Sequence, residues 1–254
     1  MPLARRLLPN GTLDLMRQIV LFCGAYWLYR LARGMVYDQT VSAFDHAQDV
    51  IHLERSTHVF VEHSVQAWAV GTGFLDDLAS WMYLNSHFVV TTCTLAFIYL
   101  FRNEHFYFVR NMFMVAMGLA LVGYVAFPTA PPRMFPELGF IDSVADFTGV
   151  SESSVNALFN PFAAVPSMHV CFALMLSVPM IRMVRHAWAK GLWIAYAPVV
   201  TFVVVATGNH WIFDAVSGAG VAAVSALAAQ TLFARARPQA WAWEPALAGP
   251  ARAG

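Results

Sequence analysis

Long apolar runs alternate with polar connections along this chain. Several runs reach about 20 residues, roughly what a helix needs to cross the hydrocarbon core of a bilayer. They lie at residues 16–36, 78–101, 108–127, 166–184, 190–208 and 210–233. The pattern predicts an all-α integral membrane protein, a six-transmembrane-helix bundle that forms a single membrane domain over residues 1–254. Residues 234–254 would form a C-terminal tail.

The first long external connection, residues 37–77, has a pattern of its own. Within residues 41–70, Phe44, Ala47 and Ile51 recur at helical spacing, with acidic residues and histidines between them. This periodicity predicts an external amphipathic helix that lies at the membrane face. The segment also contains His46, His52, His58 and His63. None of these histidines lies four residues from another, so we expect a hydrated polar face and no metal site.

The second long external connection, residues 128–165, is rich in proline, phenylalanine and small polar residues. These residue types favour turns over long regular helices. We therefore expect a structured loop, with a short helix near residues 150–158.

Composition agrees with a membrane location. Hydrophobic residues make up 59% of the chain and charged residues 12%, against about 45–50% and about 25% in ordinary soluble domains. The mean hydropathy is +0.56. Because the formal net charge is zero, nothing indicates nucleic-acid binding. The cysteines, Cys23, Cys93 and Cys171, lie in apolar runs and predict neither a disulfide framework nor a metal site.

Basic residues concentrate in alternate connections. Those that flank the turns between the second and third and between the fourth and fifth spans are Arg102, Arg110, Arg182, Arg185 and Lys190. Others precede the first span and follow the sixth. By the positive-inside rule, both termini are expected in the cytoplasm, and the membrane is the plasma membrane if the protein is bacterial. The basic N-terminus also suits a signal peptide, but no small-residue cleavage site follows, which favours a retained first span.

The chemically versatile polar residues fall at the opposite, extracytoplasmic edge of the predicted spans. They are Arg133 after the third span, Ser167 and His169 at the start of the fourth, and His210 and Asp214 at the start of the sixth. Ionisable groups at membrane depth are costly and by default indicate a functional site. Span counting alone therefore predicts that these residues meet.

The start of the fourth span has the features of a phosphate site. Pro166 suits the first position of a helix, because its missing N–H would be unpaired there anyway. The next N–H groups and the positive end of the helix dipole favour an anion. Ser167 adds a hydroxyl donor, and Arg133 can offer a bidentate fork.

His210 and Asp214 are four residues apart and therefore share one helical face. Asp214 can fix the tautomer of His210 and free its other nitrogen for attack. His169 supplies a second imidazole for proton transfer. This constellation indicates phosphoryl transfer through a phosphohistidine. The sequence shows no Walker-type glycine loop and no carboxylate cluster for magnesium, so we expect a metal-independent reaction without a cofactor.

Structural explanations stay open for each residue taken alone. A single histidine in a membrane helix usually packs against a neighbour, and a His–Asp pair can be structural, but the joint placement at one edge favours function. Tyr83, Asn85, His87 and Asn209 are candidate accessory residues for phosphate or acceptor contacts. Packing between helices explains the three in the second span equally well.

These residues resemble the motifs of the type 2 phosphatidic acid phosphatase superfamily. The second motif, P-S-G-H, is matched by Pro166-Ser167-Met168-His169. The end of the third motif, S-R-x5-H-x3-D, is matched by His210 and Asp214. The arginine of the first motif, K-x6-R-P, is matched by Arg133. The resemblance implies a six-helix membrane fold and metal-independent action on lipid phosphates. It also implies that His210 is the nucleophile and that His169 donates a proton to the leaving group.

The chain departs from these motifs at basic positions. Ala126 stands at the lysine of the first motif, and Met134 follows Arg133 where the family has proline. Val203 and Val204 stand at the serine and arginine of the third motif. The resemblance therefore implies a phosphate site with fewer basic groups than the family pattern.

A finer similarity covers residues 41–220. It is a similarity to the branch that contains inositol phosphorylceramide synthases. It rests on the stretches P-S-x-H, G-N-H-x3-D and P-x-A-P-P-R and on residues 43–66 and 82–88. This similarity implies an inositolphosphotransferase-like enzyme that can transfer to an alcohol as well as to water.

Two classes of function follow. The first is a phosphatase or phosphotransferase that acts on a membrane lipid with a phosphate headgroup, with water or an alcohol such as inositol as acceptor. The alternative is a non-catalytic binder or carrier of an anionic lipid headgroup, which the missing basic residues keep open. A transporter would need ionisable residues at mid-bilayer, and here they cluster at one edge.

Overall fold

A computed structural model describes residues 8–34, 40–149 and 162–233. Of these residues 83% are helical, and no β-strand occurs among them. The helix expected near residues 150–158 and the tail at 234–254 lie outside the described ranges. The all-α prediction is therefore confirmed for the part of the chain that the structure describes.

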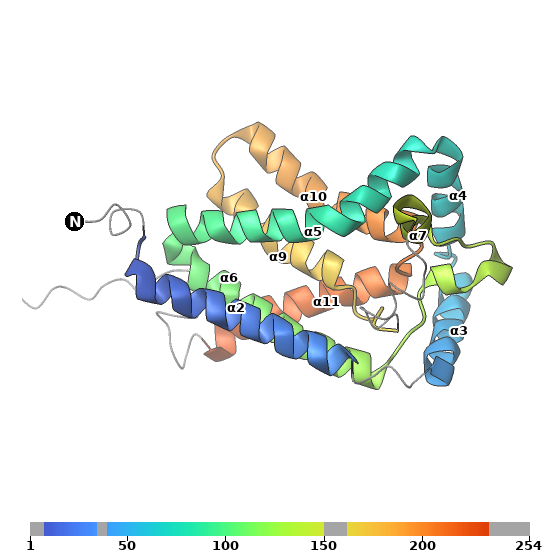
Figure 1. Cartoon of the computed structure of the whole chain (residues 1–254), viewed down its shortest axis with the longest axis horizontal. Coiled ribbons are helices and arrows are strands. Elements are labelled where there is room, and N and C mark those ends of the chain that lie inside the picture. The colour runs from blue at the N-terminus through green and yellow to red at the C-terminus, as the bar shows by residue number, and fades with distance from the viewer. Residues whose placement is uncertain (1–7, 35–39, 150–161, 234–254) are drawn as a thin grey trace, which may run out of the picture.

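The long helices lie roughly along the long axis of the molecule (Figure 1). They are α2 (Gly11–Gly34), α5 (Phe74–Phe101), α6 (Asn103–Ala126), α9 (Met168–Met183), α10 (Ala187–Ala206) and α11 (Ile212–Leu227), the last continued by the π-helical turn η3 (Ala228–Phe233). Four segments are long and apolar enough to cross a membrane: α5, α6, α10, and α11 extended to Thr231. These helices indicate an integral membrane protein.

The predicted spans at 16–36 and 166–184 correspond to α2 and α9, which are not among those four. In α2 the apolar run is short, because Arg17 and Arg30 interrupt it at both ends. The 16 residues of α9 cover only about 24 Å at 1.5 Å per residue, against about 30 Å for the hydrocarbon core. A total of six spans stays a prediction.

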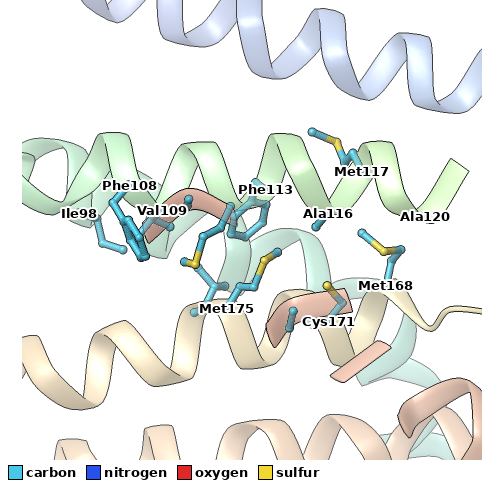
Figure 2. Close-up of a cluster of buried hydrophobic side chains, with 14 of the residues drawn as sticks. Ile98, Phe108, Val109, Phe113, Ala116, Met117, Ala120, Met168, Cys171 and Met175 are labelled. Atoms are coloured by element: carbon cyan, nitrogen blue, oxygen red, sulfur yellow. The ribbon is translucent and has the colours of Figure 1, made fainter. Parts of the chain in front are cut away.

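Helix α9 is the centre of the bundle. It packs against α5, α6, α10 and α11, and most of its side chains are buried. Figure 2 shows Met168, Cys171 and Met175 of α9 facing Phe113 and Ala116 of α6 in one apolar cluster. In a bilayer, van der Waals packing of this kind is what holds helices together, since lipid tails are as apolar as the side chains.

The start of α9 lies directly on α11. The Ser167 N–H donates to the Asp214 carbonyl at 3.0 Å. A Cβ added to Gly218 would stand 2.3 Å from the Ser167 carbonyl oxygen. Only a residue without a side chain allows this approach, which is how small residues bring membrane helices together.

The short helices gather at the end of the bundle where α9 and α11 begin (Figure 1). They are α3 (Thr40–Ser56), α4 (Glu62–Thr72), α7 (Ser143–Thr148) and the 3-10 turns η1 (Pro132–Met134) and η2 (Pro136–Leu138). This layer holds the two connections that the sequence places outside the membrane.

The single amphipathic helix expected over 41–70 is wrong, because the chain breaks between α3 and α4. His58 adopts a φ of 60°. Its N–H donates to the Arg55 carbonyl at 3.2 Å, and the Val59 N–H donates to the Glu54 carbonyl at 2.9 Å. These bonds form a Schellman motif, in which a left-handed residue ends a helix.

The apolar stripe of α3 is buried against protein and not against the bilayer surface. Ala43, Ala47 and Ile51 form one cluster with Phe135 and Trp211. The sequence predicts this stripe at the membrane face, whereas in the structure it packs on the loop between α6 and α9 and on the start of α11.

The contact at Gly218 makes a first prediction. Gly218→Ala should lower the free energy of unfolding by about 1–3 kcal/mol, because overpacking forces the backbones of α9 and α11 apart. Gly220→Ala is the matched control, since a Cβ there meets nothing within 4 Å. Thermal unfolding of the purified variants in detergent measures the difference, and equal midpoints for both would contradict the account of this contact.

Candidate active site

A tight turn between α10 and α11 presents the first site residues. Gly208 has a φ of 68°; its N–H donates to the Val205 carbonyl at 3.0 Å, and the Asn209 N–H donates to the Val204 carbonyl at 3.1 Å. This is again a Schellman motif, here with the glycine that such ends favour. The turn places Asn209 and His210 immediately before α11.

His210 and Asp214 form the central pair of the site. His210 Nδ1 lies 3.1 Å from Asp214 Oδ2, and the same oxygen accepts from the Trp211 N–H at 2.9 Å. Asp214 is fully buried and His210 is 6% exposed. Because Nδ1 faces a carboxylate oxygen, the proton belongs on Nδ1 and the lone pair on Nε2. The arrangement can therefore supply an oriented imidazole nucleophile or base.

Two buried polar atoms where α9 meets α11 have no hydrogen-bond partner among the described residues. Ser167 is fully buried, and its Oγ finds no hydrogen-bond partner among the described residues. Asp214 Oδ1 is also buried and without a partner in the described ranges. Unpaired buried polar atoms are rare and call for an explanation; a ligand oxygen placed beside Ser167 would satisfy its hydroxyl.

His169 extends from the first turn of α9 toward His210. The two ring centroids are 5.8 Å apart, with an angle of 65° between the planes. Tyr83 stacks on His169 at 4.7 Å, and the His87 ring lies 4.5 Å from it. His169 is partly exposed whereas His210 is buried, so the pair is open to solvent on the His169 side.

Arg133 is fastened to the turn that precedes His210. Its Nη1 donates to Asn209 Oδ1, its Nε lies 3.3 Å from Asp142 Oδ2, and its backbone N–H donates to the Gly208 carbonyl at 2.8 Å. Neither of these side-chain contacts uses Nη2. The η1 turn is thereby held against the α10–α11 turn.

The structure thus brings together most of the residues that the sequence singles out. Ser167, His169, His210 and Asp214 form one cluster, with Arg133 attached through Asn209 and with Tyr83 and His87 beside His169. Asn85 does not join it. Its side chain is exposed and donates to the Trp81 carbonyl of its own helix at 2.9 Å.

Two carboxylates at the site were missed in the sequence. Glu62 accepts from the Ile212 N–H and Glu54 accepts from the Phe213 N–H, each at 2.8 Å. Both side chains come from other helices, α3 and α4, and cap the first turn of α11. A signal existed for Glu54, because it continues the apolar stripe through Ala43, Ala47 and Val50 at helical spacing.

Of the positions that depart from the family motifs, Ala126 is exposed and Met134 is half-buried, whereas the two valines lie in the apolar core. Val203 and Val204 are 4% and 1% exposed. Within the described ranges, no group of three or more His, Cys, Asp or Glu side chains is arranged to hold a metal ion. Of the histidines on α3 and α4, His52 and His63 are exposed, whereas His46 stacks on Phe127 at 4.2 Å.

Comparison with known proteins identifies the class. Residues 48–228 match the PAP2 superfamily, and since this range covers most of the chain, the protein belongs to that superfamily. Its members are phosphatases or phosphotransferases, which supports an enzyme acting on phosphate esters. No curated protein matches the chain. No solved structure matches it either.

The contacts of Asn209 make a second prediction. Asn209→Ala should lower the free energy of unfolding by about 1–3 kcal/mol, because Arg133 and the Thr207 carbonyl and hydroxyl lose a buried partner. Asn85→Ala, which removes only a bond within an exposed helical turn, should stay within about 0.5 kcal/mol. Thermal unfolding midpoints compare the two, and a larger loss for Asn85→Ala would overturn this reading.

Proposed function

We propose that this protein is a metal-independent lipid phosphatase or phosphotransferase that forms a phosphohistidine at His210. The observation that carries the proposal is the His210–Asp214 pair with the ring of His169 only 5.8 Å from that of His210. Membership of the PAP2 superfamily supports a reaction at a phosphate ester.

The proposed reaction has two displacements. In the first, His210 Nε2 attacks phosphorus, the P–O bond to the lipid breaks, and His169 gives a proton to the leaving oxygen. In the second, His169 takes a proton from the acceptor, whose oxygen attacks phosphorus as the N–P bond breaks. Asp214 stabilises the imidazolium character of His210 in both steps, and acid–base catalysis by His169 contributes about 10²–10⁴-fold.

The phosphoryl group lies at the start of α9 in this proposal. The Ser167 hydroxyl has no partner among the described residues, and the helix N-terminus directs N–H groups toward an anion. Arg133 Nη2 adds a cationic donor. The first N–H groups of α11 are already bonded to Glu54 and Glu62, so the other helix start is closed to phosphate. The α9 start also replaces part of the missing basic charge.

The substrate is proposed to be a membrane lipid with a phosphate headgroup. Large apolar side chains on α5 and α11, such as Trp81, Phe88 and Val216, are more than half exposed, which suits contact with acyl chains. The site lies at one end of these helices, where a headgroup would lie. The charge bias of the sequence assigns this end to the extracytoplasmic face and the termini to the cytoplasm.

The acceptor is water or an alcohol. The similarity to the branch with inositol phosphorylceramide synthases favours a polyol such as inositol. Tyr83 and His87, which flank His169, stand where an acceptor hydroxyl would approach that base. A non-catalytic carrier of an anionic headgroup remains the second candidate, because Ala126, Val203 and Val204 lack the polar groups of the family motifs.

Phosphate release tests the proposal. Purified protein in mixed micelles is given a panel of lipid phosphates that begins with phosphatidic acid, in the presence of a chelator. His210→Asn should abolish turnover, and His169→Asn should reduce it by about 10²–10⁴-fold. His52→Asn, an exposed histidine on α3, is the control and should retain full activity. Wild-type-like turnover by His210→Asn would rule out the mechanism.

Labelled substrate separates the remaining candidates. Substrate with ³²P in the phosphate should leave acid-labile, base-stable label on the wild type and none on His210→Asn. Adding inositol should divert label from free phosphate to a new ester if the enzyme is a transferase. Binding of the lipids without label transfer or turnover would instead support the carrier.

A further inference from the structure

Glu54 and Glu62 form a buried acidic pair against the first turn of α11. They are 2% and 0% exposed. Each uses Oε1 to accept a backbone N–H of α11 at 2.8 Å. In each the other oxygen, Oε2, is buried and has no partner among the described residues. Two buried carboxyl oxygens without hydrogen-bond donors at one place are rare in protein interiors.

The charges around this pair are unfavourable to two ionised carboxylates. Burial, first of all, and then the side chain of Glu62 raise the pKa of Glu54 to about 9, with a further contribution from the charge of Asp214; the Phe213 N–H acts in the opposite direction. Two like charges at close range cannot both ionise easily away from water.

The cations nearby do not neutralise the pair. Arg55, on the same helix as Glu54, lies over the Phe60 ring with its guanidinium carbon 5.0 Å from the centroid. His210 is bonded to Asp214, and His58 and His63 are exposed. Within the part of the chain that the structure describes, a proton is therefore the remaining means of removing one of the two charges.

We propose that Glu54 and Glu62 share one proton between their Oε2 atoms and act as positioning residues that clamp the first turn of α11, and with it His210 and Asp214. The proton satisfies both unpaired oxygens in one hydrogen bond. The remaining single negative charge faces the positive end of the α11 dipole, where it is stabilising. The catalytic part of this inference rests on the proposed function, but the proton pair itself does not.

The clamp reaches the site through the backbone. The capped residues, Ile212 and Phe213, lie between His210 and Asp214 in the chain. A shift of this turn therefore changes the relation between the His210 ring and the carboxylate that orients it. Misplacement by about 1 Å can reduce a rate by about 10²-fold.

Glutamine and leucine at position 54 separate the roles of the pair. Glu54→Gln keeps an oxygen for the Phe213 N–H and an N–H donor for Glu62 but cannot titrate, so kcat at neutral pH should stay within about threefold of wild type. Glu54→Leu loses both bonds, and kcat should fall about 10–100-fold with little change in KM, because the α9 phosphate site is untouched. Glu137→Gln, at an exposed position of η2, is the control.

Stability against pH is the second readout and needs no turnover. The folded protein binds the pair's proton more tightly than the unfolded chain does, so this contribution is fully present below pH 4.5 and is lost as pH rises toward about 9. The thermal midpoint of the wild type should therefore fall over this range by several degrees more than that of Glu54→Gln. Glu137→Gln should follow the wild type.

The outcomes are distinct. Parallel pH profiles of the thermal midpoint for wild type and Glu54→Gln would overturn the shared proton. A loss of kcat in Glu54→Gln as large as in Glu54→Leu would overturn it as well, because the bonds are kept in glutamine. If no phosphate ester is turned over, the proposed function fails, whereas divergent stability profiles would still establish the proton pair.

Discussion

The site depends on the contact between the start of α9 and the first turns of α11. Asp214 has two roles here: its carbonyl accepts the Ser167 N–H across the contact, and its side chain holds His210 and the Trp211 N–H on the α11 side. The absent side chain at Gly218 lets the backbones meet. One buried residue thus sets the orientation of an imidazole and the distance between two helices. Without this contact, the rings of His169 and His210 would not lie next to each other.

A second layer of interactions aligns the turn before α11. Gly208 reverses the chain after α10, and Arg133 ties that turn to the loop between α6 and α9 through Asn209. Asp142 both holds Arg133 and accepts from the Ala145 N–H at the start of α7. The layer of short helices is therefore part of the site and not merely a cover over it. Because of these contacts, residues that are far apart in the chain lie together at the site.

Much of the site was predictable, because membrane spans restrict where a residue can lie. Counting apolar runs placed His169 and His210 at one end of the bundle, and the spacing of His210 and Asp214 indicated their bond. The roles of these residues stay proposals. The break at His58 was not predictable, because its left-handed backbone has no glycine to announce it. Glu62 was missed because burial of a carboxylate depends on tertiary neighbours and not on local pattern.

The helix end at His58 has a wider consequence. A left-handed backbone costs a non-glycine residue about 1–2 kcal/mol, and here the imidazole itself is exposed. That cost is offset because the reversal turns α4 back toward α11, so that Glu54 and Glu62 arrive at the same helix end from opposite sides of the bend. The backbone of one exposed residue therefore helps to bring two buried carboxylates to the same helix end.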